Sequence, residues 1–503
     1  MADFVSRFYS VSQLNDQNFP KGVNMLTRLY VTGFKNLVDT EIRFGPFTCI
    51  AGLNGVGKSN IFDAIHFLAQ LADRPFVEAA LATRGGTDIG DLFTVGGEGK
   101  MRFDCDILIP SQGIDDFHQP AEASQTFLNY SLELSLVREE GGIPRIRLTH
   151  EKLVYIPRRE ARKRLGFSHA GAWRDSVVKT SQRRAPFIDM EGDGEKRLVR
   201  LSSDKMKDES KSKRGGGRPT DFLANNLPRT ALSGAQNADE ARTAVLVRRE
   251  MRSWRILQLE PSALRRPDEL QAPASMAVDG EHLPATLYKI ARSGDENRVY
   301  AELANRLSEL VDDVHGIRVD RDDARRLLRL MMIDRGGVEL PASSLSDGTL
   351  RFVALSVLEQ DSDTTGLICL EEPENGIHPE RMDAIVELLS DMAIDPGVPV
   401  GNDNPLRQVI VSTHSPVVAA RARPDELVFA DTRDPPSFSP GKINALVVRS
   451  IRGTWRDDGI SPHAAVGEVM KYLDTLRTSR PEKSGQKTVF EAIAKQLSLP
   501  FGA

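Results

Sequence analysis

Gly52-Leu53-Asn54-Gly55-Val56-Gly57-Lys58-Ser59 is the stretch that decides the fold, because it has the full G-x-x-x-x-G-K-[ST] pattern of a phosphate-binding P-loop. Apolar residues of strand length, 47–52, lead into it, and residues 58–72 continue with apolar side chains at helical spacing. Glycines let backbone N–H groups turn inward around an anion, and the start of the next helix attracts phosphate. We expect Lys58 to reach the β- and γ-phosphates and the Ser59 hydroxyl to bind Mg²⁺. The alternative is a Gly-rich turn without a ligand.

Two later strands are expected to end in polar residues. Residues 367–370 are continuously apolar and lead to Glu371 and Glu372, and residues 409–411 lead to His414 three residues further on. Such runs are typical of strands buried on both faces of a parallel sheet, whose carboxyl ends bind ligands. Glu371 is placed to hold Mg²⁺, and Glu372 to orient and polarise an attacking water. A solvated acidic turn and a structural histidine are the alternatives.

A fourth motif, Ser346-Asp347-Gly348, precedes an apolar helix predicted over residues 350–358. By itself a Ser or Asp at this position is usually only a helix N-cap. A helix N-terminus also attracts anions through the helix dipole.

The order of these motifs resembles the ATP-binding-cassette (ABC) ATPases. Within them it is similar to the soluble branch of RecF, the structural-maintenance-of-chromosomes (SMC) heads and the OLD-type nuclease ATPases. Phe34-Lys35-Asn36-Leu37 resembles the opening of that branch, and residues 52–60 match its G-x-N-G-x-G-K-S-N form. Residues 370–379 resemble its E-E-P-E-x-x-x-H-P run. The resemblance implies an ATP-driven homodimer in which two heads sandwich two ATP molecules.

The resemblance also assigns roles to residues. It implies that Ser346 and Gly348 contact the γ-phosphate of the opposite protomer's ATP and that His414 steadies the γ-phosphate. The implied catalytic residues are Lys58, Glu372 and His414; the ATP contacts are Asn54, Gly55, Val56, Gly57, Lys58, Ser59, Asn60, Ser346 and Gly348; the Mg²⁺ ligands are Ser59 and Glu371.

Three features depart from the family pattern. Glu371 stands where many relatives have Asp, so the metal contact could be longer and turnover slow. The Ser-Asp-Gly-Thr signature at residues 346–349 differs from the transporter form Ser-Gly-Gly-Gln, which argues against a transporter subunit. The glutamine of the family's Q-loop has no assignable position.

After His414 we find no Asp-x-Asp strand end of the Toprim type, so we expect any nuclease to be a separate partner protein.

Residues 157–220 contain 18 Lys or Arg against 9 Asp or Glu. Their apolar periodicity fades, and residues 211–219 (KSKRGGGRP) are flexible by composition. Clustered cations can neutralise DNA phosphates without reading sequence. The alternative is a solvated loop, or one that binds an acidic protein. The expected DNA contacts are Arg158, Arg159, Arg162, Lys163 and Arg164.

The predicted fold class is α/β: a P-loop ABC head, with a parallel core sheet beside an antiparallel sheet, split by an inserted α+β lid. Residues 101–156 alternate like antiparallel strands, and helical patterns return between 241 and 314. The expected parts are 1–156, the N-terminal half of the head; 157–325, the lid with a basic flexible segment at 157–220; 326–455, the C-terminal half; and 456–503, a helical tail.

Composition limits the class of protein. The 503 residues carry a net charge of −5 and are 40% hydrophobic, as in an ordinary globular protein. No apolar run approaches the roughly 18–20 residues that span a bilayer. The first ten residues do not resemble a secretory signal, and three scattered cysteines form no disulfide framework. We therefore expect a cytoplasmic protein without a membrane partner.

Two biological roles remain open from the sequence. The first is a DNA-engaging ATPase of repair or phage defence. The second is a regulatory switch whose ATP state holds or releases a separate effector protein, such as a nuclease or toxin.

Overall fold

The computed structural model describes residues 25–85, 88–138, 141–204, 219–401, 404–405, 407–434, 444–457 and 462–464, together with Val469 and Tyr472. Residues 205–218, which include most of the KSKRGGGRP stretch, and most of the expected tail at 456–503 lie outside the described residues.

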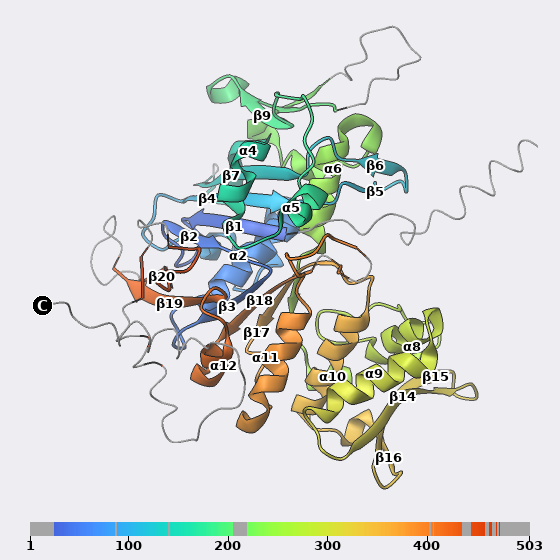
Figure 1. Ribbon diagram of the computed structural model, residues 1–503. Coiled ribbons are helices and arrows are strands. Elements are labelled where there is room, and N and C mark those ends of the chain that lie inside the picture. Colours follow the sequence, from blue (N-terminus) through green and yellow to red (C-terminus); the bar gives the residue numbers. More distant parts are fainter. Residues whose placement is uncertain are drawn as a thin grey trace, which may run out of the picture.

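An antiparallel sheet of eight strands forms the upper layer in Figure 1. Buried and less buried side chains alternate along the first half of β4, as predicted for residues 101–156. The strands in spatial order are β11 (Thr220–Leu223), β10 (Leu198–Leu201), β9 (Ile188–Glu191), β8 (Pro144–Tyr155), β7 (Phe127–Arg138), β4 (Lys100–Leu108), β1 (Met25–Thr32) and β2 (Thr40–Arg43).

A second sheet of six strands lies below the first in Figure 1. Neighbouring strands from β12 to β19 are parallel, and β20 pairs antiparallel with β19. The strands in spatial order are β12 (Arg255–Leu257), β17 (Gly366–Glu371), β18 (Arg407–Thr413), β3 (Phe47–Ala51), β19 (Leu427–Arg433) and β20 (Ala445–Ser450). The predicted strands at 47–52, 367–370 and 409–411 are thus confirmed.

Helices cover both faces of the parallel sheet. The helices are α2 (Lys58–Leu71), α3 (Phe76–Leu81), α4 (Arg158–Leu165), α5 (Gly171–Val177), α6 (Ala238–Ser253), α7 (Pro261–Leu264), α8 (Leu283–Ser293), α9 (Glu296–Ser308), α10 (Asp347–Gln360), α11 (Met382–Asp391) and α12 (Pro416–Arg421). The remaining strands are β5 (Gln112–Ile114), β6 (Pro120–Glu122), β13 (Asp268–Glu269), β14 (Val314–Asp322), β15 (Leu327–Asp334) and β16 (Glu339–Pro341). In the described part of the chain, no helix combines the length and apolar character needed to cross a membrane.

The parallel sheet is buried on both faces, as its continuous apolar strands predict. Ile50 and Ile410 pack with α2 and the antiparallel sheet in one core. Cys49 and Val411, one position along the same strands, pack in a second core with α10, α11 and α12. Helix α2 therefore lies between the two sheets, with the P-loop at its start. The predicted α/β class, with a parallel core sheet beside an antiparallel sheet, is confirmed.

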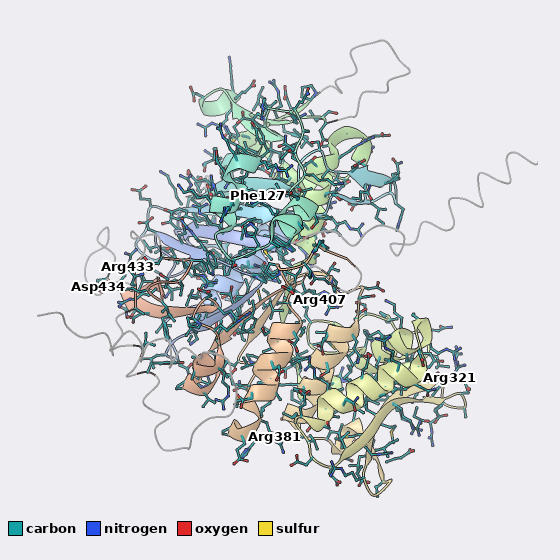
Figure 2. The ribbon with its side chains drawn as sticks, viewed as in Figure 1. Phe127, Arg321, Arg381, Arg407, Arg433 and Asp434 are labelled. Carbon is teal, nitrogen blue, oxygen red and sulfur yellow. The ribbon has the colours of Figure 1, made fainter. Side chains whose placement is uncertain are left out.

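Two buried polar residues of β18 connect the layers. The Gln408 amide donates to the carbonyl oxygens of Leu26 (2.8 Å) and Gly45 (2.9 Å) and accepts the N–H of Leu26 (2.9 Å). Arg407, labelled in Figure 2, donates to three carbonyl oxygens, in the last turn of α10 and in the loop after it, and burial lowers the pKa of its guanidinium to about 10. These bonds fix β18 against β1 on one side and α10 on the other.

The expected division of the chain into parts stays a prediction. Residues Leu153 of β8 and Ile188 of β9, on either side of the expected boundary at 156, are paired in one sheet. The basic stretch forms α4, α5, β9 and β10 in its described residues. The buried aromatic side chains of Phe167, Trp173 and Phe187 anchor these elements, although their irregular spacing gave no periodic signal in the sequence.

Glu250 on α6 makes stability depend on pH. Its carboxyl group is buried, accepts the indole N–H of Trp254 (2.8 Å), and has a pKa that burial raises to about 8. The folded state therefore prefers the protonated acid. That stabilisation is complete below the unfolded pKa of about 4.5 and is lost as the pH rises toward 8. Glu250→Gln is expected to remove a slope of up to about 1.4 kcal/mol per pH unit across this window.

Urea unfolding of wild type and variant between pH 5 and pH 8.5 would measure this difference. The matched control is Glu240→Gln, at an exposed position in the first turn of the same helix. Glu240→Gln should show the same pH dependence of stability as wild type, and Glu250→Gln should show a weaker one. Parallel pH profiles for wild type and Glu250→Gln would contradict the prediction.

Candidate active site

The P-loop connects β3 to α2, as predicted. Gly55 and Gly57 have φ angles of 82° and 101°, in the left-handed region that favours glycine. A Cβ on Gly57 would lie 2.4 Å from the amide of Asn36, so this position has no room for a side chain. Asn36 donates to the carbonyl oxygen of Val56 (3.0 Å) and accepts from Asn60 (2.8 Å). The Phe-Lys-Asn-Leu motif thus supports the P-loop from behind.

The Lys58 side chain is buried within the loop. Its ammonium group donates to the carbonyl oxygens of Gly52 and Leu53, both at 2.8 Å. Burial lowers the pKa of Lys58, and the carboxylates of Glu372, Glu374 and Glu371 oppose that shift. The cation is therefore held at the centre of the loop, close to three acids.

The loops that follow β12, β17, β18 and β3 meet at one edge of the sheet, because these neighbouring strands are all parallel. Ser59 donates to Oε2 of Glu371 at 3.2 Å, which joins the P-loop to the end of β17. Oε1 of Glu372 lies 2.7 Å from Nδ1 of His414, which joins the ends of β17 and β18. The structure thus brings together Lys58, Ser59, Glu371, Glu372 and His414.

Glu372 has a strained backbone. Its φ of 47° lies in the left-handed region, which non-glycine residues rarely adopt, and such strain gathers at functional sites. The N–H of Glu372 donates to the carbonyl oxygen of Ser412 (2.8 Å), and Asn375 donates to its Oε2 (2.9 Å). The carboxylate is therefore aimed by His414 on one side and Asn375 on the other.

Glu374 adds a third carboxylate beneath the site. It is buried, accepts the Thr413 hydroxyl, and has a pKa that burial raises. Its other oxygen, Oε2, has no hydrogen-bond partner among the described residues. Glu374 belongs to the E-E-P-E run by sequence, but it lies inward of Glu371 and Glu372.

Arg84 is a site residue that the sequence did not reveal. Its guanidinium donates to both oxygens of Glu371 (2.7 and 3.1 Å), to Asp63 (3.1 Å) and to the carbonyl oxygen of Ser59 (3.3 Å). The hydrogen bond with Glu371 raises the pKa of Arg84. Arg84 lies in a turn after α3 with no motif around it, so only the fold places it here.

A cavity of about 380 Å³ opens beside Glu371 and Glu372. Its lining includes Gln258, directly after β12, and Arg351 of α10. Arg351 donates to the carbonyl oxygens of Leu259 (3.3 Å) and Asn375 (2.7 Å), so it ties α10 to the loops after β12 and β17. Gln258 directly follows β12, the edge strand beside β17, and the sequence gave no signal for it because β12 has only three residues.

The signature motif forms the start of α10. Ser346 is the N-cap: its Oγ accepts the N–H of Thr349 at 3.1 Å, as an N-cap residue should. Gly348 packs so closely against the turn after β17 that a Cβ would lie 2.2 Å from the carbonyl oxygen of Gly376. Ser346 and Asp347 are exposed. The motif therefore presents its first two residues outward.

The predicted DNA contacts all lie on α4. Ala161 and Leu165 bury one side of this helix, and Arg164 donates to the buried Asp106 at 2.9 Å. The other four cations, Arg158, Arg159, Arg162 and Lys163, are exposed, with Arg158 paired to Asp175 at 2.7 Å. Figure 1 places α4 at the upper end of the molecule, on the antiparallel sheet.

The donor set suits Mg²⁺ bound together with a nucleotide. Ser59 and Glu371 offer a hydroxyl and a carboxylate within 3.2 Å of each other, and Mg²⁺ prefers one or two such oxygens plus phosphate oxygens. Within the described ranges, no three His, Cys, Asp or Glu side chains form a group that could hold a metal unaided. The phosphate oxygens of a bound nucleotide would therefore complete the coordination.

Comparisons with known proteins give partial matches. Short segments match the DNA replication and repair protein RecF from two organisms. The match to RecF of Porphyromonas gingivalis (strain ATCC 33277) is 32% identical over 66 residues, which are 13% of this chain and 18% of that protein. The match to RecF of Parabacteroides distasonis is 44% identical over 46 residues, which are 9% of this chain and 13% of that protein. The chain thus spans less than a fifth of the length of these curated relatives.

Solved structures of SMC heads align with most of the chain at low similarity. The SMC head domain from Thermotoga maritima is 14% identical with a TM-score of 0.35, covering 85% of this chain and 99% of that one. The Pyrococcus furiosus Smc head bound to the C-terminal domain of ScpA is 12% identical with a TM-score of 0.40, covering 90% of this chain and 100% of that one.

A family model covers more of the sequence. The family described as "AAA domain, putative AbiEii toxin, Type IV TA system" matches residues 47–115 and 213–420, just over half of the chain. The two matched segments contain the P-loop, Arg84, Gln258, the signature and the acidic strand end. The unmatched residues between them include α4, α5 and several strands of the antiparallel sheet. On this match the chain belongs to that AAA domain family and is an ABC-type P-loop ATPase.

Proposed function

We propose that this chain is a Mg²⁺-dependent ATP hydrolase whose heads pair around ATP and act on DNA. One observation carries the enzymatic part: the P-loop, Glu371, Glu372 and His414 follow three neighbouring parallel strands and meet at one edge of the sheet. Hydrolysis of a phosphoanhydride needs positioning and charge stabilisation more than covalent chemistry, and these residues supply both.

The roles follow from the contacts. Bound Mg²⁺-ATP supplies the γ-phosphoryl group and its charge neutralisation. Lys58 would exchange its two carbonyl partners for phosphate oxygens, and Ser59 and Glu371 would hold the metal. Glu372, aimed by His414 and Asn375, accepts a hydrogen bond from the attacking water and orients it. Since Nδ1 of His414 holds Glu372, its other ring nitrogen, Nε2, is the atom that would face the γ-phosphate.

The ion pair between Arg84 and Glu371 has to break before that carboxylate can hold a metal. The bidentate pairing of Arg84 with Glu371 occupies both carboxylate oxygens, and holding Mg²⁺ would need at least one of them. The guanidinium has a strong alternative acceptor in the phosphates, because Arg binds carboxylate and phosphate with the same fork of donors. Nucleotide binding therefore exchanges one anionic partner of Arg84 for another.

The pairing of heads is supported by the signature. Ser346 and Asp347 are exposed at the start of α10, where the helix dipole attracts an anion. A second copy of the chain would bring its own nucleotide to this helix start. The same pairing would complete two sites at once, which is the arrangement that the family resemblance implies.

We propose that the exposed face of α4 binds DNA. Its exposed cations, Arg158, Arg159, Arg162 and Lys163, lie within six positions on one short helix that a hydrophobic core fixes in place. The RecF segments that match this chain belong to proteins named for DNA replication and repair, which also favours DNA. Such contacts would be independent of DNA sequence and weakened by salt.

The double variant Arg162→Glu/Lys163→Glu tests this surface. Loss of two phosphate contacts is expected to lower the slope of log affinity against log salt by about 2 and to weaken duplex DNA binding at low salt by about tenfold or more. Fluorescence anisotropy with labelled duplex DNA between 50 and 200 mM salt measures both, alongside DNA stimulation of ATP turnover.

Arg325→Glu/Arg326→Glu is the matched control. These two exposed cations lie between β14 and β15, at the opposite end of the molecule from α4 in Figure 1. The control should bind DNA like wild type. Equal losses in both variants would attribute binding to overall charge, and unchanged binding in the α4 variant would contradict the proposed surface.

A second candidate function is an ATP-dependent switch that holds an effector protein. The family description names a toxin and a type IV toxin–antitoxin system, which favours a protein partner. ATP turnover that is indifferent to duplex DNA at both low and physiological salt would favour this function over the first. A co-purifying nuclease or toxin, released when ATP is hydrolysed, would then identify the effector.

A further inference from the structure

The signature of this chain carries a negative charge at an unfavourable place. Asp347 follows Ser346 directly, is exposed, and belongs to the helix start that is proposed to meet the partner's polyphosphate. A carboxylate near a phosphate repels it, and juxtaposed like charges oppose association. The chain therefore needs a cation at this position if the heads pair as proposed.

Arg265 supplies that cation. Its Nη2 donates to Oδ1 of Asp347 at 2.6 Å and to the carbonyl oxygen of Leu345 at 3.0 Å. One nitrogen therefore holds the residues on both sides of Ser346. The Nε and Nη1 groups of Arg265 make no hydrogen bond to the described residues, so they remain donors that can face an anion.

The arginine stands on a fixed support. It follows α7 as its C-cap, and its N–H bonds to the carbonyl oxygen of Pro261 at 3.1 Å. Leu264, the residue before it, is fully buried in the core that also contains α10. The side chain thus extends from a rigid turn to the signature, and the ion pair does not depend on a mobile loop.

We infer that Arg265 is a positioning residue for the ATP-dependent pairing of heads. It neutralises Asp347 and fixes Ser346 so that the signature can accept the polyphosphate bound by a second copy of the chain. The inference rests on the proposed function, because it concerns the signature acting on the partner's nucleotide. No residue of the chain's own P-loop is involved.

The test compares dimer formation and nucleotide binding in one background. Glu372→Gln is expected to slow hydrolysis, so that ATP-bound dimers can be measured by sedimentation velocity. Adding Arg265→Gln is expected to raise the dimer dissociation constant about tenfold or more, because each of the two sites gains an unpaired carboxylate beside phosphate. Binding of a fluorescent ATP analogue to the monomer should stay unchanged, since the P-loop is intact.

Arg266→Gln is the matched control. This neighbouring arginine pairs with Glu281 at 2.6 Å, away from the signature, and its loss removes the same charge from the protein. It should leave the dimer constant unchanged. A dimer constant that is the same in all three proteins would overturn the inference.

A second substitution separates neutralisation from simple structural support. In the double variant Arg265→Gln/Asp347→Asn the charge that needs neutralising is gone, so most of the lost affinity for the partner should return. A double variant as weak as Arg265→Gln alone would overturn the neutralisation. Should Arg265→Gln not fold, Arg265→Lys keeps the charge, but its ammonium ends one bond short of the Nη2 position that contacts Leu345 and Asp347. Pairing of heads as strong as in wild type in this variant would overturn the fixing of Ser346 by Arg265.

Failure of the proposed pairing of heads and failure of the Arg265 inference would give different results. If Glu372→Gln protein with an intact Arg265 forms no dimer at any ATP concentration, the pairing of heads itself is wrong. If it dimerises and Arg265→Gln makes no difference, only the role of Arg265 is wrong.

Discussion

Lys58→Ala is expected to abolish ATP binding. The variant removes the only ammonium group at the centre of the P-loop, where it lies 2.8 Å from two loop carbonyl oxygens and close to three carboxylates. Without this cation, the phosphates would lose a positive charge that lies close to Glu371, Glu372 and Glu374, and we expect affinity to fall by about a hundredfold or more. Isothermal titration with ATP and Mg²⁺ measures the loss directly.

Thermal unfolding provides an independent check on the same variant. Ligand that binds only the folded state raises the unfolding temperature, so wild type should gain stability with ATP and Lys58→Ala should not. Lys100→Ala, at an exposed position on β4, is the control and should respond like wild type. ATP binding that survives in Lys58→Ala would contradict the nucleotide site.

Glu372→Gln is expected to reduce ATP turnover by about a hundredfold or more while ATP still binds. Glutamine has nearly the same shape, and its carbonyl oxygen can still accept the Asn375 hydrogen bond, but it is a far weaker acceptor for the attacking water. The bound ATP should then persist, and the dimer fraction should rise. Phosphate release and sedimentation velocity on the same samples measure both effects.

The control for this variant is Glu380→Gln, an exposed glutamate in the turn before α11. It should hydrolyse ATP like wild type. Wild-type turnover in Glu372→Gln would show that the attacking water is oriented by another residue, and Glu374 would be the next carboxylate to test.

Much of the site could be predicted because its pieces have local signals. The P-loop lies between a recognisable strand and helix, and two continuous apolar runs identified β17 and β18 with the polar residues that follow them. Parallel strands that are neighbours bring their carboxyl ends together, so Glu371, Glu372 and His414 converge as expected. Their roles in catalysis stay predictions until the variants are measured.

The residues that could not be predicted have no local signal. Arg84 reaches Glu371 across 287 positions of sequence, from a turn whose residues show no motif. Gln258 follows a three-residue strand that is too short for any periodicity to appear. Arg265 and Asp347 are 82 positions apart, and only the packing of α7 beside α10 makes them partners.

The basic stretch shows the opposite limitation. Its many charges suggested a flexible segment, whereas α4, α5, β9 and β10 form there in the described residues. A few buried aromatic side chains, Trp173 above all, supply enough apolar contact to order the chain without a regular pattern. The composition of such a region is dominated by its exposed charged side chains, so it does not reveal the few buried side chains that stabilise its fold.

Phosphate release from ATP by the purified full chain tests the central claim most directly, namely that Lys58, Ser59, Glu371, Glu372 and His414 form one hydrolytic site. We predict release that requires Mg²⁺, stops when EDTA is added, and is lost in both Lys58→Ala and Glu372→Gln. Release that continues at the same rate in EDTA and in both variants would contradict the account.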